Sequence, residues 1–218
     1  MLLQLAIDRA ESLSIVPQVA DLIDIVEVGT PTLKRLGLAA IATVRELAPG
    51  VPVLADTKTV DGGEQEAEMV FSAGATFMSV LAFAGPATLA ATLEVAARHG
   101  TYVVVDAFDD EGQRRVETKG VPDACAYVVS HAPSDSPSIR GGRAAAHMDM
   151  VARFHERGYR VMLAGGIDRS NLARAVRAEP EVLVVGRAVA DATNPRRVVE
   201  WILQQLPERG HGWPWEPR

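Results

Sequence analysis

Short apolar runs rich in β-branched residues alternate eight times with longer segments along the chain. Runs of this length are typical of buried strands. They predict strands at Leu2–Asp8, Asp24–Gly29, Val53–Lys58, Thr76–Ala82, Tyr102–Ala107, Ala126–His131, Arg160–Gly165 and Val182–Arg187. Most of these runs begin about one strand–helix unit after the start of the preceding run.

The intervening segments place apolar residues at the three- and four-residue spacing of an amphipathic helix. The clearest predicted helices are Leu38–Leu47, Ala87–Arg98, Asn171–Arg177 and Arg196–Leu206. Gly74, Gly100 and Gly158 follow helical segments, as helix-ending glycines do, and Asn194-Pro195 is typical of a helix start. Eight strand–helix units favour an α/β fold of the (β/α)8 TIM barrel type, with a doubly wound open sheet as the alternative.

Composition narrows the class of protein. The 218 residues are 48% hydrophobic and 23% charged, which suits one folded domain, predicted here at 1–208 with a tail at 209–218. A net charge of −6 argues against nucleic acid as a partner. No apolar run is long enough to span a membrane, and the N-terminus has no basic region typical of a signal peptide. We therefore expect a soluble, cytoplasmic protein.

Polar residues and glycines stand where the predicted strands end. In a barrel the carboxyl ends of all strands meet on one face, where catalytic residues gather. The residues placed there are Asp8, Glu27, Asp56, Lys58, Asp106, His131, Gly165, Gly166, Gly186 and Arg187. Any one of them could be a solvated strand end, but the recurrence in so many units predicts a single functional site.

The segment Asp56–Asp61 (DTKTVD) is the densest of these elements. Residues 56 and 58 of a strand point to the same side, so an acid would hold a lysine charged and oriented. Such a lysine can stabilise a developing anion or deliver a proton. The alternative is a surface ion pair between Asp56 and Lys58.

Glu27 and Asp56, on adjacent predicted strands, could share a divalent cation, and paired carboxylates with room for water suit Mg²⁺. The alternative is a pair of carboxylates separated by the lysine. His131 could act as a general acid or base, whereas the other histidines, His147 among them, are expected on the surface.

Two glycine turns follow the seventh and eighth predicted strands, at Gly165-Gly166 and Gly186-Arg187. Glycine lets backbone amides approach a phosphate, and barrels often bind phosphate at these two positions. Arg187 would add a two-pronged contact. The turns therefore predict a phosphate site, although a glycine can also simply turn the chain.

The segment Asp56–Ala75 (DTKTVDGGEQEAEMVFSAGA) resembles the Asp-x-Lys-x-x-Asp segment of the orotidine 5′-monophosphate decarboxylase superfamily. The flanking segments are most similar to its 3-hexulose-6-phosphate synthase branch. These segments are Leu3–Asp8 (LQLAID), Val26–Pro31 (VEVGTP), Val103–Asp106 (VVVD) and Ala164–Ile167 (AGGI). The resemblance covers nearly the whole chain.

The resemblance implies a (β/α)8 barrel that acts as a homodimer with shared active sites, using Mg²⁺ and a phosphorylated sugar. It implies that Glu27 and Asp56 hold the metal, that Lys58 faces an enediolate and that His131 is the acid/base residue. Asp61 would act in the partner's site. Gly166, Gly186 and Arg187 would form the phosphate site. Asp8, Asp106 and Gly165, at the ends of predicted strands, are further expected substrate contacts. The implied reaction is a reversible aldol condensation of formaldehyde with D-ribulose 5-phosphate.

Some residues depart from the synthase pattern. Segment 132–142 carries two prolines and lacks the expected glutamine, and Arg187 is closer to the sister branch of 3-keto-L-gulonate 6-phosphate decarboxylases. That branch has a glutamate where Asp106 stands. The alternatives are therefore a decarboxylase of that kind and a barrel that binds a sugar phosphate without turnover.

Overall fold

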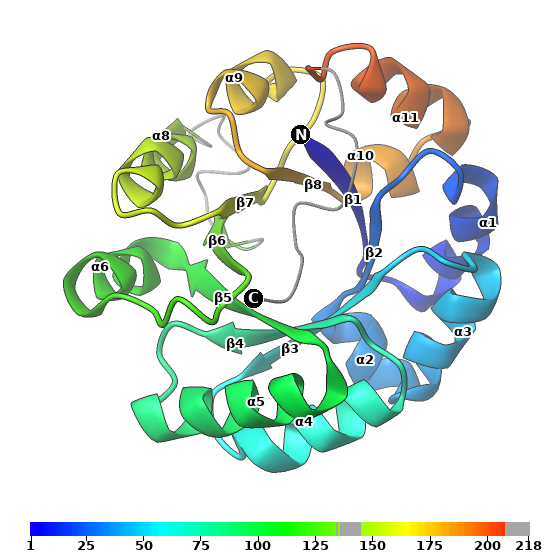
Figure 1. Cartoon of the computed structure of the whole chain (residues 1–218). Helices are drawn as coiled ribbons and strands as arrows, with labels where there is room; N and C mark the ends of the chain where they lie inside the picture. Colours follow the sequence, from blue (N-terminus) through cyan, green and yellow to red (C-terminus); the bar gives the residue numbers. More distant parts are fainter. Residues whose placement is uncertain (134, 136–144, 208–218) are drawn as a thin grey trace.

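Eight parallel strands form a closed barrel, β1 to β8 in chain order, in the computed structural model, which describes residues 1–133, 135 and 145–207 (Figure 1). The strands are β1 (Leu2–Ile7), β2 (Ile25–Val28), β3 (Val53–Thr59), β4 (Phe77–Leu81), β5 (Tyr102–Phe108), β6 (Tyr127–His131), β7 (Val161–Ala164) and β8 (Val182–Val185). β1 pairs with both β2 and β8, which closes the ring. The predicted (β/α)8 barrel is confirmed, and the open sheet is excluded.

Helices surround the barrel on its outer face (Figure 1). They are η1 (Ala10–Ile15), α1 (Val16–Val19), α2 (Thr30–Leu36), α3 (Ala39–Leu47), α4 (Gly63–Ser72), α5 (Pro86–His99), α6 (Asp109–Lys119), α8 (Ala145–His155), α9 (Leu172–Arg177), α10 (Arg187–Ala190) and α11 (Pro195–Leu203). The side chain of Asn194 caps α11 by accepting from the Arg197 amide at 3.1 Å, as the Asn-Pro signal predicts.

Five of the predicted strands extend too far at their carboxyl ends, and β1, β2 and β4 end one residue before the predicted ends. β7 ends at Ala164 and β8 at Val185, one and two residues before the predicted ends. Gly165 has a φ of 103°, a conformation that leaves the strand. The chain after β8 turns at Gly186 directly into α10. The glycines that were predicted to end strands therefore already belong to the turns.

Strand alternation divides the core into two shells. Val103 and Val105 of β5 face the helices, and Val104 between them faces the barrel interior. The interior is filled by an apolar cluster that includes Leu54, Phe77, Val104, Tyr127, Val129, Met162 and Val184. The polar residues at the carboxyl ends of the strands lie next to this cluster.

Two segments of interest lie wholly or largely outside the described residues. Only 132, 133 and 135 of segment 132–142 are described, and the predicted tail at 209–218 is not. Within the described part of the chain, no helix has the length and apolarity needed to cross a membrane.

Candidate active site

A cavity of about 840 Å³ opens at the carboxyl ends of the strands. Every strand contributes to its lining, as expected for a barrel enzyme. Ten of the residues predicted from strand ends line it: Asp8, Glu27, Asp56, Lys58, Asp106, His131, Gly165, Gly166, Gly186 and Arg187. Asp61 is the exception, because it is exposed beyond the end of β3 and does not line the cavity.

The end of β3 is irregular, and this irregularity places Lys58. The register with β4 shifts between Ala55 and Thr59, and Lys58 has a φ of 50°, in the left-handed region. The hydroxyl of Ser79 accepts a hydrogen bond from the Lys58 backbone amide at 2.9 Å, which holds this conformation. Residues 56 and 58 meet as the sequence predicts, with the ammonium nitrogen 3.0 Å from Asp56 Oδ2, although β3 is not a regular strand here.

Lys58 lies between two carboxylates and next to a histidine. Its Nζ donates to Asp106 Oδ2 at 2.7 Å, and Nδ1 of His131 lies 3.1 Å from Asp106 Oδ1. Asp106 is buried, whereas Lys58 and His131 keep part of their surface open to the cavity. The predicted surface ion pair is therefore excluded, because this charge cluster lies inside the barrel mouth.

The charges in this cluster support one another. Burial disfavours ionisation of Asp106, but His131 and Lys58 outweigh it and lower the pKa of Asp106 to about 2. Burial also opposes charge on Lys58, yet Asp106 and Asp56 raise its pKa above the ordinary value. The same balance, with Asp106 as the main partner, raises the pKa of His131. Lys58 is thus a fixed cation beside a histidine that can carry a proton.

Asp56 is fixed by two hydroxyl donors that strand-end reasoning missed. Ser79 Oγ donates to Asp56 Oδ1 at 2.7 Å, and Thr30 Oγ1 donates to Asp56 Oδ2 at 2.8 Å. Both hydroxyls come from neighbouring elements, β4 and α2. The signal for Ser79 is a single polar residue within an apolar run. Thr30 stands at the first position of a helix, where a hydroxyl is also common as a cap.

Glu27 extends the carboxylate cluster to the second strand. Burial and the Asp56 carboxylate raise the pKa of Glu27 to about 8. The pKa of Asp8 is raised as well, first by partial loss of solvent at the cavity mouth, where the residue stays exposed, and then by Asp56. Carboxylates that hinder one another's ionisation form a set that a cation would relieve, and oxygen pairs of this kind suit Mg²⁺. The donor chemistry therefore fits a divalent cation.

The cation site would have only two carboxylate ligands, Glu27 and Asp56. Within residues 1–133, 135 and 145–207, no group of three or more His, Cys, Asp or Glu side chains is arranged to hold a metal ion. A Mg²⁺ ion bound by one or two carboxylates usually completes its shell with water and substrate oxygens.

The glycine turns follow β7 and β8 and line the same cavity. Gly165 and Gly166 have φ angles of 103° and 65°, which only glycine adopts readily. A Cβ on Gly165 would lie 2.5 Å from the carbonyl oxygen of Ala132, so the turn also packs closely against the end of β6. Gly186 precedes α10, and Arg187 is exposed at the start of that helix, lining the cavity. The two turns leave backbone groups and one guanidinium facing the cavity mouth.

His147 contradicts its predicted place on the surface, because only 5% of it is exposed. Burial lowers the pKa of His147 to about 4, and the backbone of Gly165 bonds its ring. Its own carbonyl accepts from Ser130 Oγ at 2.6 Å. The helical period of α8 could not reveal these contacts, since they come from β6 and the turn after β7.

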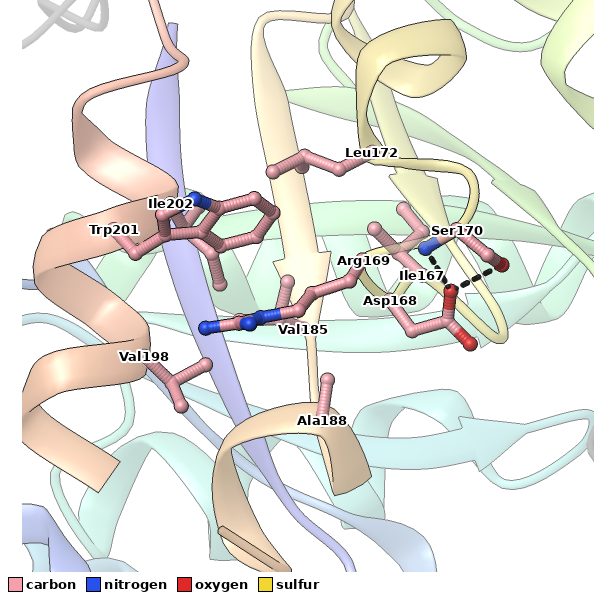
Figure 2. Close-up of a pocket in the computed structure, with 10 residues that line it drawn as sticks. All are labelled: Ile167, Asp168, Arg169, Ser170, Leu172, Val185, Ala188, Val198, Trp201 and Ile202. Carbon is pink, nitrogen blue, oxygen red and sulfur yellow. Dashed lines mark hydrogen bonds between the residues drawn. The ribbon is translucent and has the colours of Figure 1, made fainter. Parts of the chain in front are cut away.

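A second pocket, of about 340 Å³, lies outside the barrel between the turn after β7, α9, α10 and α11 (Figure 2). Its lining is largely apolar, with the Arg169 guanidinium carbon 4.8 Å from the ring centre of Trp201. None of the predicted site residues lines it. The predicted site residues that line a pocket therefore all line the cavity at the barrel mouth, and none lines the second pocket.

The chain is similar to proteins of known family. The "Orotidine 5'-phosphate decarboxylase / HUMPS family" matches residues 1–202. A 3-hexulose-6-phosphate synthase of Mycobacterium gastri is 33% identical over 204 residues, covering 89% of this chain and 94% of that protein. A solved 3-hexulose-6-phosphate synthase from Salmonella typhimurium is 32% identical, with a TM-score of 0.82 over 94% of this chain and 98% of that one.

The fold extends to the sister branch. A solved 3-keto-L-gulonate-6-phosphate decarboxylase from Vibrio cholerae has a TM-score of 0.77 at 23% identity, covering 94% of this chain and 96% of that one. These comparisons confirm the resemblance that was inferred from the residues. The chain belongs to the orotidine 5′-phosphate decarboxylase / HUMPS family.

Proposed function

We propose that this protein is an aldolase of the 3-hexulose-6-phosphate synthase type, which reversibly condenses formaldehyde with D-ribulose 5-phosphate through an enediolate. The observation that carries the proposal is the ammonium group of Lys58, held at 2.7 Å from Asp106 and 3.0 Å from Asp56 at the cavity floor. Relatives about 30% identical over most of the chain, which are named as synthases, support it.

The residues can carry each proton and charge of this reaction. Removal of a proton from carbon 1 of the ketose moves an electron pair onto the carbonyl oxygen. Lys58 stabilises the resulting negative charge, because its own charge is fixed and close. Carbon 1 then bonds to the carbon of formaldehyde, whose oxygen becomes an alkoxide and takes a proton. His131, in its neutral form, can accept the first proton and return one to the alkoxide.

A divalent cation, Mg²⁺, would be held by Glu27 and Asp56. When bound, it supplies a Lewis acid that polarises the oxygens of the sugar. Ser79 and Thr30 keep Asp56 oriented for this role through their hydroxyl hydrogen bonds. Asp8, which lines the cavity, would bind a sugar hydroxyl.

The phosphate of the sugar would bind at the two glycine turns. Gly165, Gly166 and Gly186 allow close approach of the backbone, and Arg187 supplies positive charge. These turns follow β7 and β8, on the other side of the closed ring from β3, which carries Lys58. The reactive end of the sugar would therefore face Lys58 while the phosphate is held at the other side.

We further propose a cytoplasmic homodimer in which Asp61 serves the partner's site. The large hydrophobic side chains with the greatest exposure in the described residues are Leu36, Leu38, Val60 and Met69, at 37–52%. They come from α2, the residue before α3, the residue after β3, and α4, and the last two flank Asp61 in the chain. A dimer would cover this apolar surface.

Mixing two inactive variants tests the shared site. If Asp61 acts across the interface, Asp61→Ala mixed with Lys58→Ala should regain part of the activity, because each hybrid dimer contains one intact site. Size-exclusion chromatography of tagged and untagged protein would show that subunits exchange. Exchange without recovered activity would contradict the shared site.

A paired assay with Mg²⁺ tests the function itself. One arm mixes ribulose 5-phosphate with formaldehyde and follows loss of formaldehyde, and the other offers 3-keto-L-gulonate 6-phosphate and follows release of CO₂. Loss of formaldehyde that disappears in Lys58→Ala is the expected result. Release of CO₂ alone would place the chain with the decarboxylases, and no turnover in either arm would favour a sugar-phosphate-binding role.

A further inference from the structure

Gln4 is a buried amide at the base of the cavity. It lies on β1, only 2% exposed, and its register neighbours are Ile25 on β2 and Val184 on β8. Both neighbours belong to the apolar cluster that fills the barrel interior. A polar side chain in such surroundings is uncommon unless its hydrogen bonds are satisfied.

Only one half of this amide is bonded to the protein. Nε2 of Gln4 donates to Glu27 Oε2 at 2.5 Å, whereas Oε1 is buried without a hydrogen-bond partner among the described residues. In this orientation the amide NH₂ donates to an oxygen of Glu27, which can accept the bond whether or not the carboxyl is ionised. Gln4 also lines the cavity, so a molecule bound there can reach it.

We propose that Gln4 is a positioning residue that sets the affinity of the cavity for a divalent cation. Its NH₂ group restrains one oxygen of Glu27, and its carbonyl oxygen is left to accept a hydrogen bond from a water molecule in the loaded cavity. The inference rests on the proposed function, which assigns the cation to Glu27 and Asp56. It adds a residue that the strand-end pattern did not single out.

A purely structural role makes a different prediction. A buried amide with one unpaired oxygen is not a favourable packing element, so an apolar side chain of equal length would fill the space as well. A structural Gln4 would therefore affect unfolding and leave cation binding unchanged. A positioning Gln4 would affect cation binding in a protein that still folds.

The test measures binding of Mn²⁺ alone, by electron paramagnetic resonance of the free ion, to the full chain without substrate. Gln4→Met keeps the length of the side chain and removes the amide. Met162→Leu is the matched control, because Met162 belongs to the same interior cluster, lines the cavity and makes no bond to Glu27. Gln4→Leu is a second variant in case the first does not fold, as judged by circular dichroism.

We expect Gln4→Met to bind Mn²⁺ about ten-fold more weakly, the usual effect of removing a partner of a metal ligand, and Met162→Leu to bind as the wild type does. Raising the Mg²⁺ concentration should then restore the kcat of Gln4→Met. Wild-type affinity in both Gln4 variants, with binding lost in Glu27→Gln, would overturn the role of Gln4 and leave the cation site intact. No binding by the wild type would overturn both.

Discussion

Replacing Asp106 by asparagine removes one buried negative charge at nearly constant volume. The carboxylate bonds Lys58 Nζ at 2.7 Å and His131 Nδ1 at 3.1 Å, and it is 2% exposed. The variant leaves the lysine with Asp56 as its carboxylate contact and removes the carboxylate that the His131 ring bonds. We expect both a loss of stability and a change in how stability depends on pH.

The size of the loss follows from the buried ion pairs. A fall in the pKa of Asp106 from 3.8 to about 2 corresponds to about 2 kcal/mol of stability. Removing one partner of a buried pair costs about 3–5 kcal/mol when the other charge is left uncompensated, and the remaining contact of Lys58 with Asp56 places this variant at the lower end of that range. We therefore expect Asp106→Asn to be less stable by about 3 kcal/mol or more near neutral pH.

The two pKa shifts have opposite signs and define a pH window. The pKa of Asp106 is lowered on folding, so its contribution is present above its ordinary pKa and is lost as the pH falls toward about 2. The pKa of His131 is raised, so its contribution is present below its ordinary pKa of 6.5 and is lost as the pH rises through the folded value. The wild type should exceed Asp106→Asn most between about pH 4 and pH 6.5.

Urea unfolding at a series of pH values, from about 3 to 9, measures this difference. Asp149→Asn is the control, because Asp149 is 70% exposed in its ion pair with Arg174 and should cost at most about 1 kcal/mol. A difference between the wild type and Asp106→Asn that stays constant across the series would refute the coupling of Asp106 to His131.

Three further predictions address the site. Lys58→Met should fold and lower kcat by about 10²–10³-fold with a smaller change in KM, measured by steady-state kinetics, and a change in KM alone would contradict its role toward the enediolate. Gly165→Ala should lose about 1–3 kcal/mol of stability and bind sugar phosphate more weakly than the control Gly50→Ala. Gly50 shares a positive φ, but a Cβ there would meet no atom within 4 Å. Equal effects of the two substitutions in calorimetry would argue against crowding by Ala132. Chelation by EDTA should abolish turnover and Mg²⁺ should restore it, whereas full activity after dialysis against EDTA would remove the metal assignment.

The barrel could be predicted because strand and helix periods repeat eight times with little interruption. Helix α9 begins at Leu172, one residue after the predicted start. The apolar period shows that a helix is present, but it does not show which residue caps it. The ends of β7 and β8 were placed too late because an apolar run does not show where a glycine leaves the strand direction. The φ of Gly165 is a property of the turn, which depends on its packing against Ala132.

The polar residues and glycines of the site could be predicted from one rule, the common face of strand ends. Ten of them line the cavity because β-strands in a closed barrel deliver their carboxyl ends together. Ser79, Thr30 and Gln4 escaped this rule, since a single polar residue in a strand or at a helix start has many ordinary uses. The bulge at Lys58 escaped it as well, because the register of β3 is decided by its neighbour β4.

Hydrogen exchange at carbon 1 of ribulose 5-phosphate is the most direct measurement of the central claim, that Lys58 and its neighbours stabilise an enediolate. Proton NMR in D₂O, with Mg²⁺ and without formaldehyde, follows the loss of the carbon 1 signal. Stabilisation of the enediolate by Lys58, with proton removal by His131, predicts exchange with the wild type and its loss in Lys58→Met and His131→Asn. Absence of exchange by folded wild-type protein that binds the sugar phosphate would contradict it.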